Sequence, residues 1–171
     1  MSILNYLVPL HHNAGEDMSE LVNRDAYVKR FDRFLDEKKM RKTPERYAIL
    51  RCILAFQSHF TIEHLAQSME QEAYHVSRAT LYNTLQLLVE AALVRKHVFE
   101  GLQVQYEKAG NTPHSHLICT HCGKLKEVRD NDFNAYMNAR KFTAFTADYY
   151  MLYFYGTCST CARKMKKQKT K

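Results

Sequence analysis

Four of the five cysteines form two C-x-x-C pairs, a pattern typical of metal binding or of thiol redox chemistry. The pairs are Cys119/Cys122 and Cys158/Cys161, and 35 residues lie between them. Four thiolates around a tetrahedral ion suit structural zinc, and each C-x-x-C can bind from a single turn. We expect a four-cysteine zinc site that staples a small domain together. Two unrelated knuckles or a redox C-x-x-C are the alternatives.

A second group of candidate ligands contains histidine and glutamate. His114 and His116 share one side of an extended segment, because side chains alternate there. Glu107 lies shortly before this pair, and His59 lies far upstream. Such nitrogen and oxygen ligands suit Fe(II), Mn(II) or Zn(II). From spacing alone, ordinary surface histidines explain the pattern equally well. The following are expected to be surface or packing residues: His64, His75, His97 and His121.

Hydrophobic periodicity predicts the elements that position these residues. Apolar residues at helical spacing indicate four helices in the first half of the chain. Their expected starts or N-caps are Asp25, Thr43, Thr61 and Ser77. Two β-like runs, 93–99 and 104–107, then flank a glycine-containing turn and predict a hairpin. Short helices followed by a hairpin indicate a winged helix, whose last helix enters the DNA major groove.

The second half predicts a small α/β unit. A helix is expected over 132–142, followed by an aromatic strand over 148–156. Such a strand is costly as an exposed edge, so another subunit or the same chain must cover it. The fold class is therefore α+β. We assign an N-terminal extension (1–24), a winged-helix DNA-binding domain (25–104), a dimerisation and metal-binding domain (105–161) and a basic tail (162–171).

Composition narrows the class of protein. The chain has 171 residues, 46% of them hydrophobic, and contains no apolar run long enough to span a membrane. With no export signal, we expect a cytoplasmic protein with reduced thiols and no membrane partner. The net charge is +7, but the last ten residues carry six basic side chains, which leaves +1 elsewhere. We expect a solvated, disordered tail there. Cys52 lies within a helical apolar pattern and is expected to be buried.

Taken together, these residues resemble the ferric uptake regulator (Fur) family of bacterial metal-responsive repressors. The resemblance covers roughly residues 25–161 in the family's order. The H-x-H-L-I-C-x-x-C-G-K run, residues 114–124, is its most specific part. The other carriers are Thr43-x-x-Arg46, Ala79-Thr80-Leu81-Tyr82, Phe99-Glu100-Gly101 and the segment 153–161, which ends in the second cysteine pair.

The resemblance implies a homodimer that represses transcription from a palindromic operator in double-stranded DNA. By family position, the four cysteines match the structural zinc ligands. His59, Glu107, His114 and His116 match a sensory site at the hinge between the domains. We expect Fe(II) there, with Mn(II) or a second Zn(II) as alternatives. A metal that bridges the two domains would couple metal binding to DNA binding.

Family position and side-chain chemistry together predict the DNA contacts. The first choices are Arg41, Tyr82 and Lys96, and the second choices are Arg46, Arg78, Thr80 and Asn83. Asn83 stands where the family has arginine. Asparagine reads adenine where arginine prefers guanine, so we expect an operator that differs from the usual Fur box.

Departures from the family pattern favour one function over its rivals. Many family members have a further metal site. The matching positions here carry residues that are poor metal ligands, so we expect this site to be absent. These residues are Pro113, Ser115, Asn134 and Tyr150. Glutamate at 107 disfavours peroxide sensing, the lack of a sensory cysteine disfavours zinc sensing, and the lack of a Cys-Pro dipeptide disfavours haem regulation. A zinc-locked protein with constitutive DNA binding, or with one of these three responses, remains the alternative. A zinc hydrolase is disfavoured because no dedicated general base is evident.

Overall fold

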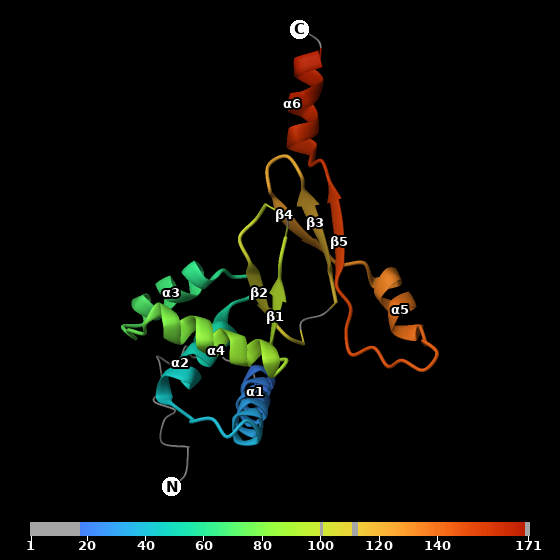
Figure 1. Ribbon diagram of the computed structural model, residues 1–171. Helices are drawn as coiled ribbons and strands as arrows, with labels where there is room; N and C mark the ends of the chain where they lie inside the picture. Colours follow the sequence, from blue (N-terminus) through green and yellow to red (C-terminus); the bar gives the residue numbers. More distant parts are fainter. Residues whose placement is uncertain (1–17, 100, 111–112, 170–171) are drawn as a thin grey trace. The chain divides into compact units, whose positions relative to one another are not determined.

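The computed structural model describes residues 18–99, 101–110 and 113–169 (Figure 1). Most of the expected N-terminal extension, Glu100 of the hairpin turn and the last two residues of the tail lie outside this set. The chain divides into two compact units, residues 1–110 and 111–171. Within the described ranges, none of the helices combines the length and the apolar character that a membrane crossing requires.

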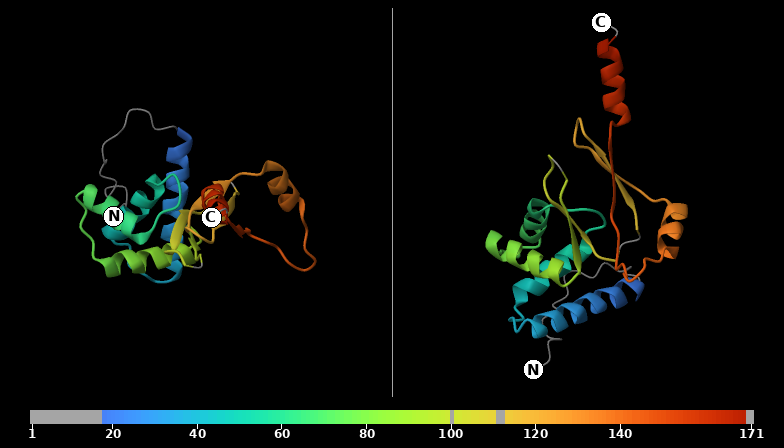
Figure 2. Two further views of the ribbon diagram at one scale, coloured as in Figure 1. Left: turned by 90° about the horizontal axis from the view of Figure 1, so that it is seen from above. Right: turned by 45° about the vertical axis from the view of Figure 1, so that its right-hand side comes forward.

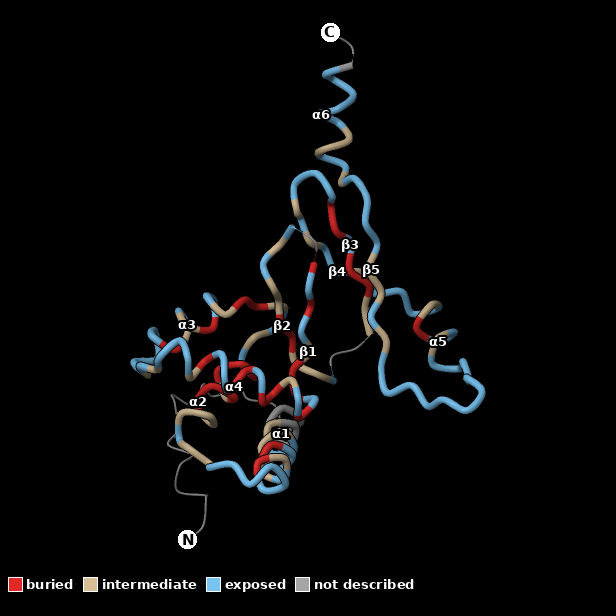
Figure 3. The backbone as a smooth tube through the Cα atoms, viewed as in Figure 1, coloured by how far each residue is buried: buried red, intermediate tan, exposed pale blue. Residues whose placement is uncertain are grey.

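In its described residues, the first unit contains four helices and a two-stranded sheet. Their bounds are α1 (Met18–Glu37), α2 (Pro44–Ala55), α3 (Ile62–Gln71), α4 (Arg78–Glu90), β1 (Val94–His97) and β2 (Gln105–Lys108). Helix α2 contacts α1, α3 and α4, and α4 also contacts β1. Large buried side chains form one core, which includes Phe31, Leu50, Phe60 and Leu88. Figure 3 colours buried residues red along the backbone.

The helix starts follow the capping residues expected from the sequence. Ser77 Oγ accepts a hydrogen bond from the Thr80 N–H at 3.1 Å. Thr61 Oγ1 accepts one from the His64 N–H at 3.2 Å, and the His64 ring accepts in return from the Thr61 N–H. His64 is therefore part of a capping box. Helix α1 begins at Met18, earlier than Asp25.

Both strands of the hairpin belong to the first unit. Strands β1 and β2 pair antiparallel, from Val94 opposite Lys108 to His97 opposite Gln105. The sequence placed residues 105–107 in the second domain, but pairing with β1 keeps them with the helices. Phe60 joins the hairpin through two backbone hydrogen bonds to Tyr106, of 2.9 and 2.8 Å.

The second unit contains a three-stranded sheet and two helices. Their bounds are β3 (Ser115–Cys119), β4 (Leu125–Val128), α5 (Asn131–Ala139), β5 (Leu152–Gly156) and α6 (Ser159–Lys169). The strand order is β4-β3-β5, with β3 antiparallel to β4 and parallel to β5. Figure 2 shows α5 beside this sheet and α6 extending beyond the end of β5. Helix α5 ends before residue 142, and β5 begins after residue 148, so both are shorter than expected.

The expectation of a disordered basic tail was wrong for residues 162–169, because α6 continues through them. The segment consists mainly of alanine, arginine, lysine, methionine and glutamine, which are all good helix formers. The charge pattern suggested a solvated end. The charge pattern did not reveal that helix propensity and the preceding cysteine pair favour an ordered helix in this segment.

Candidate functional site

The parallel pairing of β3 and β5 brings the two cysteine pairs together. Cys119 ends β3 opposite Gly156 of β5, so the chain reaches Cys158 immediately beyond this ladder. Gly123 follows the first pair with a φ of 68°, and its N–H donates to the Cys119 carbonyl at 2.9 Å. This conformation is unfavourable for residues with a side chain, so the glycine allows the tight turn that presents the first two thiols.

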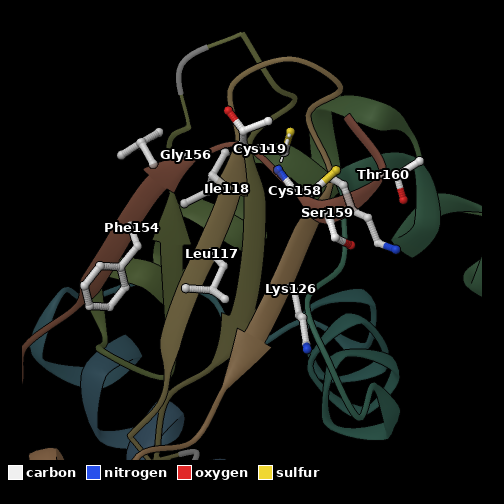
Figure 4. A pocket seen from close by; sticks show the side chains of 12 residues that line it. Leu117, Ile118, Cys119, Lys126, Phe154, Gly156, Cys158, Ser159 and Thr160 are labelled. Atoms are coloured by element: carbon white, nitrogen blue, oxygen red, sulfur yellow. Dashed lines mark hydrogen bonds between the residues drawn. The ribbon is translucent and has the colours of Figure 1, made fainter. Parts of the chain in front are cut away.

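The four thiols form one compact cluster. Two of them, Cys119 and Cys158, line the groove shown in Figure 4. All four sulfurs lie within 4.8 Å of one another, and Cys122 Sγ is 3.8 Å from Cys158 Sγ. Two sulfurs bound to one tetrahedral zinc at about 2.3 Å would lie about 3.8 Å apart. The donor types, number and spacing therefore fit structural zinc.

Backbone N–H groups make this cluster favourable for negative charge. The Cys158 N–H donates to Cys119 Sγ at 3.3 Å, and this contact is the main cause that lowers the pKa of the Cys119 thiol to about 6. The Cys161 N–H donates to Cys158 Sγ at 3.5 Å and lowers the pKa of Cys158. Hydrogen bonds with neighbouring thiols raise the pKa of Cys161 to about 12. Cys161 thus resists ionisation beside Cys119 and Cys158, and a divalent cation would relieve this.

Cys52 lies apart from this chemistry, as expected. It is buried in α2, and burial is the main cause that raises the pKa of its thiol to about 12. A neutral thiol in an apolar core acts as a small hydrophobe.

A histidine and glutamate cluster lies at the hairpin of the first unit. Glu107 on β2 has one carboxylate oxygen 3.8 Å from His59 Nε2 and the other 3.2 Å from His97 Nε2. The Phe60–Tyr106 bridge places His59 beside β2. Arg95 Nη1 lies 3.6 Å from the same carboxylate, which is only 2% exposed. The first unit therefore holds two of the predicted sensory ligands, His59 and Glu107, next to each other.

His97 was missed as a site residue, because the sequence suggested a packing role. It is fully buried, and its ring lies edge-on to that of His59 with centroids 4.9 Å apart. Strand register could have revealed it. Arg95 pairs with Glu107, so His97, two residues further along β1, lies on the same face.

The second unit holds the other two predicted ligands. His114 Nε2 and His116 Nε2 are 3.2 Å apart. Two imidazole nitrogens bound to one ion at about 2.1 Å would lie roughly 3.0 to 3.4 Å apart, so the pair fits a shared cation. The His116 ring also lies 5.3 Å from the Tyr153 ring, and His116 pairs with Glu127 across β3 and β4. Glu127 is a neighbouring carboxylate that sequence spacing did not reveal.

The positions expected to lack a metal site instead make protein hydrogen bonds. Asn134 Nδ2 donates to the Pro113 carbonyl at 2.7 Å, and the Tyr150 hydroxyl donates to Asn134 Oδ1 at 2.7 Å. Ser115 is buried at the start of β3. The Asn134 amide is thus satisfied on both sides by groups that bind no metal well.

Several candidate DNA-binding residues lie on the polar side of α4 or beside its start. Arg78, Tyr82 and Asn83 are exposed on α4, while Leu81 and Leu85 of the same helix are buried. A shallow groove between the starts of α2 and α4 is lined by Arg46, Thr80 and Asn83, among others.

The remaining candidates differ in their surroundings. Arg41 and Lys96 are exposed, Lys96 on β1 of the hairpin. The Arg46 guanidinium donates to the Arg41 carbonyl, and Thr80 Oγ1 lies 2.8 Å from Ser77 Oγ. Arg46 and Thr80 therefore also hold the local backbone, whereas Arg41 and Lys96 present their charge to solvent.

Comparisons with known proteins agree on one family. Residues 37–154 match the model of the ferric uptake regulator family. The ferric uptake regulation protein of Campylobacter jejuni is 30% identical over 154 residues, which covers 88% of this chain and 98% of that protein. The peroxide operon regulator of Bacillus subtilis is 28% identical over 131 residues, 76% of this chain and 90% of that protein.

A solved structure supports the fold independently. The Helicobacter pylori ferric uptake regulator, described as having three functional metal-binding sites, superposes with a TM-score of 0.65. The superposition covers 81% of this chain and 93% of that one, at 20% identity. The family consists of transcriptional regulators, so the hydrolase alternative is excluded. The family match and the relatives' coverage together establish that this chain belongs to the ferric uptake regulator family.

Proposed function

We propose that this family member is an iron-responsive repressor that binds operator DNA as a homodimer. The observation that carries the proposal is the pairing of ligands within each unit. His59 and Glu107 lie 3.8 Å apart in the first, and His114 and His116 lie 3.2 Å apart in the second. Each pair offers two donors, too few for a tight site. One ion shared by both pairs would have four protein ligands.

The donor set supports iron as the effector. Three imidazoles and one carboxylate match the borderline ligands of Fe(II), while Mn(II) and Zn(II) accept the same set. Selectivity among these ions would depend on geometry and metal availability. The four cysteines would hold a separate Zn(II), whose role is structural because all four positions are taken by protein thiolates.

In this proposal, metal binding selects one angle between the two units. An ion held by His59 and Glu107 on one side and by His114 and His116 on the other favours the arrangement that satisfies all four. If that arrangement spaces two copies of α4 for successive major grooves, metal raises operator affinity by population shift. Tyr82 and Asn83 would then read bases, and Arg41 and Lys96 would contact the backbone.

The sheet of the second unit supports a homodimer. Strand β5 is an edge strand in the order β4-β3-β5, and Phe154 and Tyr155 on it are each 51% exposed. Figure 4 shows Phe154 and Leu117 along the groove on this sheet. Unpaired edge strands with apolar side chains are typical of interfaces. We propose that a second copy covers this edge, which would give a two-fold dimer suited to a palindromic operator in the cytoplasm.

One experiment tests the metal and DNA claims together. Protein purified without oxygen is assayed for metals by mass spectrometry, before and after mild chelation. Operator fragments are selected from genomic DNA with Fe(II)-loaded protein, and affinity is measured in both metal states. We expect one retained zinc, one removable metal and a large loss of affinity on chelation. Two retained zincs with unchanged affinity would contradict iron sensing.

The second candidate is a zinc-locked protein that binds DNA constitutively. It is supported by Asn134 and Tyr150, which make protein hydrogen bonds where the family can hold a further metal. Control by peroxide, zinc or haem is a variant of this alternative. The chelation experiment separates the iron sensor from constitutive binding, because a constitutive protein keeps its operator affinity, and the identity of the removed metal separates iron from zinc control.

A further inference from the structure

Helix α6 is a strongly basic element that the proposed function leaves without a role. It runs from Ser159 to Lys169 and contains no acidic residue. Four of its basic side chains are described, and all four are exposed: Arg163, Lys164, Lys166 and Lys167. Because the last ten residues carry six basic side chains and the rest of the chain has a net charge of only +1, this end of the chain supplies most of the net positive charge of +7.

The basic residues repel one another along the helix. Arg163, Lys166 and Lys167 have the spacing i, i+3 and i+4, so they share one side. Like charges at these spacings destabilise a helix, and the sequence of α6 itself contains no carboxylate. Arg163 Nε donates to the Ser159 carbonyl at 3.3 Å, which fixes the first of these charges near the helix start. A bound polyanion would relieve the repulsion.

The four-cysteine cluster holds the first turn of this basic helix in place. Cys161 lies in the first turn of α6, and Cys158 lies just before it. Both sulfurs belong to the cluster that also holds Cys119 at the end of β3. The views in Figures 1 and 2 agree that α6 extends away from the sheet, and Figure 3 shows it exposed over most of its length. The charges therefore lie on an arm anchored at one end.

We infer that α6 is a phosphate-binding arm that contacts the backbone of duplex DNA. The inference rests on the proposed function, because the winged helix must first bring DNA to the protein. Lysine and arginine on an exposed helix suit sequence-independent contacts with phosphates. A membrane surface is a poorer partner, because Met165 is the only large apolar side chain in the exposed part of α6, residues 163–168.

The test is the salt dependence of DNA affinity. Zinc-loaded full-length protein is titrated with a labelled mixed-sequence duplex of about three helical turns, between about 50 and 200 mM salt. The variant Arg163→Gln/Lys164→Gln/Lys166→Gln/Lys167→Gln removes four charges and keeps helix propensity. Each lost phosphate contact lowers the slope of log K against log salt by about 0.9, so we expect a decrease of about 2 to 4.

Two further variants distinguish the loss of charge from a loss of folding. Lys166→Gln/Lys167→Gln leaves the first turn and the cysteines untouched, and it should lower the slope by about 1 to 2. Lys164→Arg/Lys166→Arg/Lys167→Arg conserves charge and should retain the wild-type slope. Zinc content and circular dichroism check each variant.

The outcomes separate this inference from the proposed function. A reduced slope with unchanged preference for selected operator DNA supports the arm. A wild-type slope in both glutamine variants overturns it, as does binding to vesicles of phosphatidylglycerol and phosphatidylcholine that depends on these charges while DNA binding does not. If wild-type protein shows no preference among duplexes, the repressor proposal fails, and the slopes still decide whether α6 binds phosphates.

Discussion

The Tyr150 hydroxyl donates a 2.7 Å hydrogen bond to the side-chain oxygen of Asn134, which joins the segment before β5 to helix α5. Asn134 is 9% exposed, and its amide nitrogen in turn donates to the Pro113 carbonyl at 2.7 Å. Three segments far apart in the chain thus meet at one amide. These hydrogen bonds link helix α5 to the segments that precede β3 and β5.

The Asn134 network should contribute measurably to stability. Tyr150→Phe removes one hydrogen bond and should cost about 1 kcal/mol of unfolding free energy. Asn134→Ala leaves both partners unsatisfied and should cost about 1 to 3 kcal/mol. Chemical denaturation of both single variants and the double variant measures the coupling. Tyr149→Phe, at an exposed neighbouring position, is the control. Additive effects would show that the two residues do not act together.

Zinc removal should unfold the second unit and leave the first folded. Cys119→Ser removes one thiolate from the cluster, and structural zinc contributes folding free energy directly. The core of the first unit, built around residues such as Phe31 and Leu88, contains none of the four cysteines. Circular dichroism with zinc analysis should show partial loss of structure. Cys52→Ala should retain zinc, although it also perturbs a packed core. A fully folded, zinc-free Cys119→Ser protein would contradict this expectation.

Thiol reactivity in metal-free protein should differ sharply between two cysteines. The pKa of Cys119 is lowered to about 6, so its thiolate predominates at pH 7. The pKa of Cys52 is raised to about 12, so its thiol remains protonated until strongly alkaline pH. Because ionisation of Cys52 is favoured only after unfolding, its contribution to stability is intact below pH 9 and lost as pH rises towards 12. Both thiols are buried, so their difference in ionisation decides the order, and iodoacetamide labelling followed by peptide mass spectrometry should detect Cys119 before Cys52. Earlier labelling of Cys52 would contradict the lowered pKa of Cys119.

His97 should influence the sensory site although family position does not assign it as a ligand. Its Nε2 lies 3.2 Å from Glu107, so it orients the carboxylate. Residues that position a metal ligand typically change affinity by about 10- to 100-fold when removed. Titration with Co(II), followed by visible absorption, should show this loss in His97→Ala. The exposed His75 on the same unit provides the matched control, His75→Ala. Equal Co(II) affinity in both variants would assign His97 to packing alone.

The exposed face of α4 should determine operator affinity and preference. Tyr82→Ala should weaken binding to selected operator DNA, because the side chain is 51% exposed on the face opposite the core. Asn83→Ala should reduce discrimination at one adenine position by about 1 to 3 kcal/mol, with smaller effects on mixed-sequence DNA. Gln67→Ala, on the exposed side of α3, should leave binding unchanged. Competition assays with single-base operator variants measure the difference.

Local patterns predicted the elements well, because capping residues and periodic apolar positions act within a few residues. Ser77 and Thr61 begin α4 and α3 through hydrogen bonds to their own first turns. The hairpin followed from alternation around one glycine-containing turn. The four-cysteine site could also be predicted from the sequence, because two C-x-x-C pairs indicate a shared site before any fold is known. Their role as zinc ligands stays a prediction.

Relations that depend on strand register could not be predicted from spacing. His97 and Glu127 lie beside candidate ligands only because β1 pairs with β2 and β3 pairs with β4 in one specific alignment. The hydrogen bonds of Asn134 likewise join segments whose proximity no local pattern encodes. The basic composition of the tail predicted a disordered end in place of α6, because charge alone carries no information on helix propensity or on the cysteines at the helix start.

The parallel pairing of β3 with β5 has a consequence for biosynthesis. The central strand of the second unit is made early, but its neighbour begins only at Leu152, and the last cysteine is at position 161. Domains generally fold in order during synthesis, so the first unit can assemble while the sheet still lacks a strand. A transcript cut short before β5 would therefore yield a winged helix with neither its proposed zinc site nor its proposed dimer edge. Regulation would then be vulnerable to truncated chains that keep a DNA-binding shape but cannot complete the proposed zinc site or the proposed dimer.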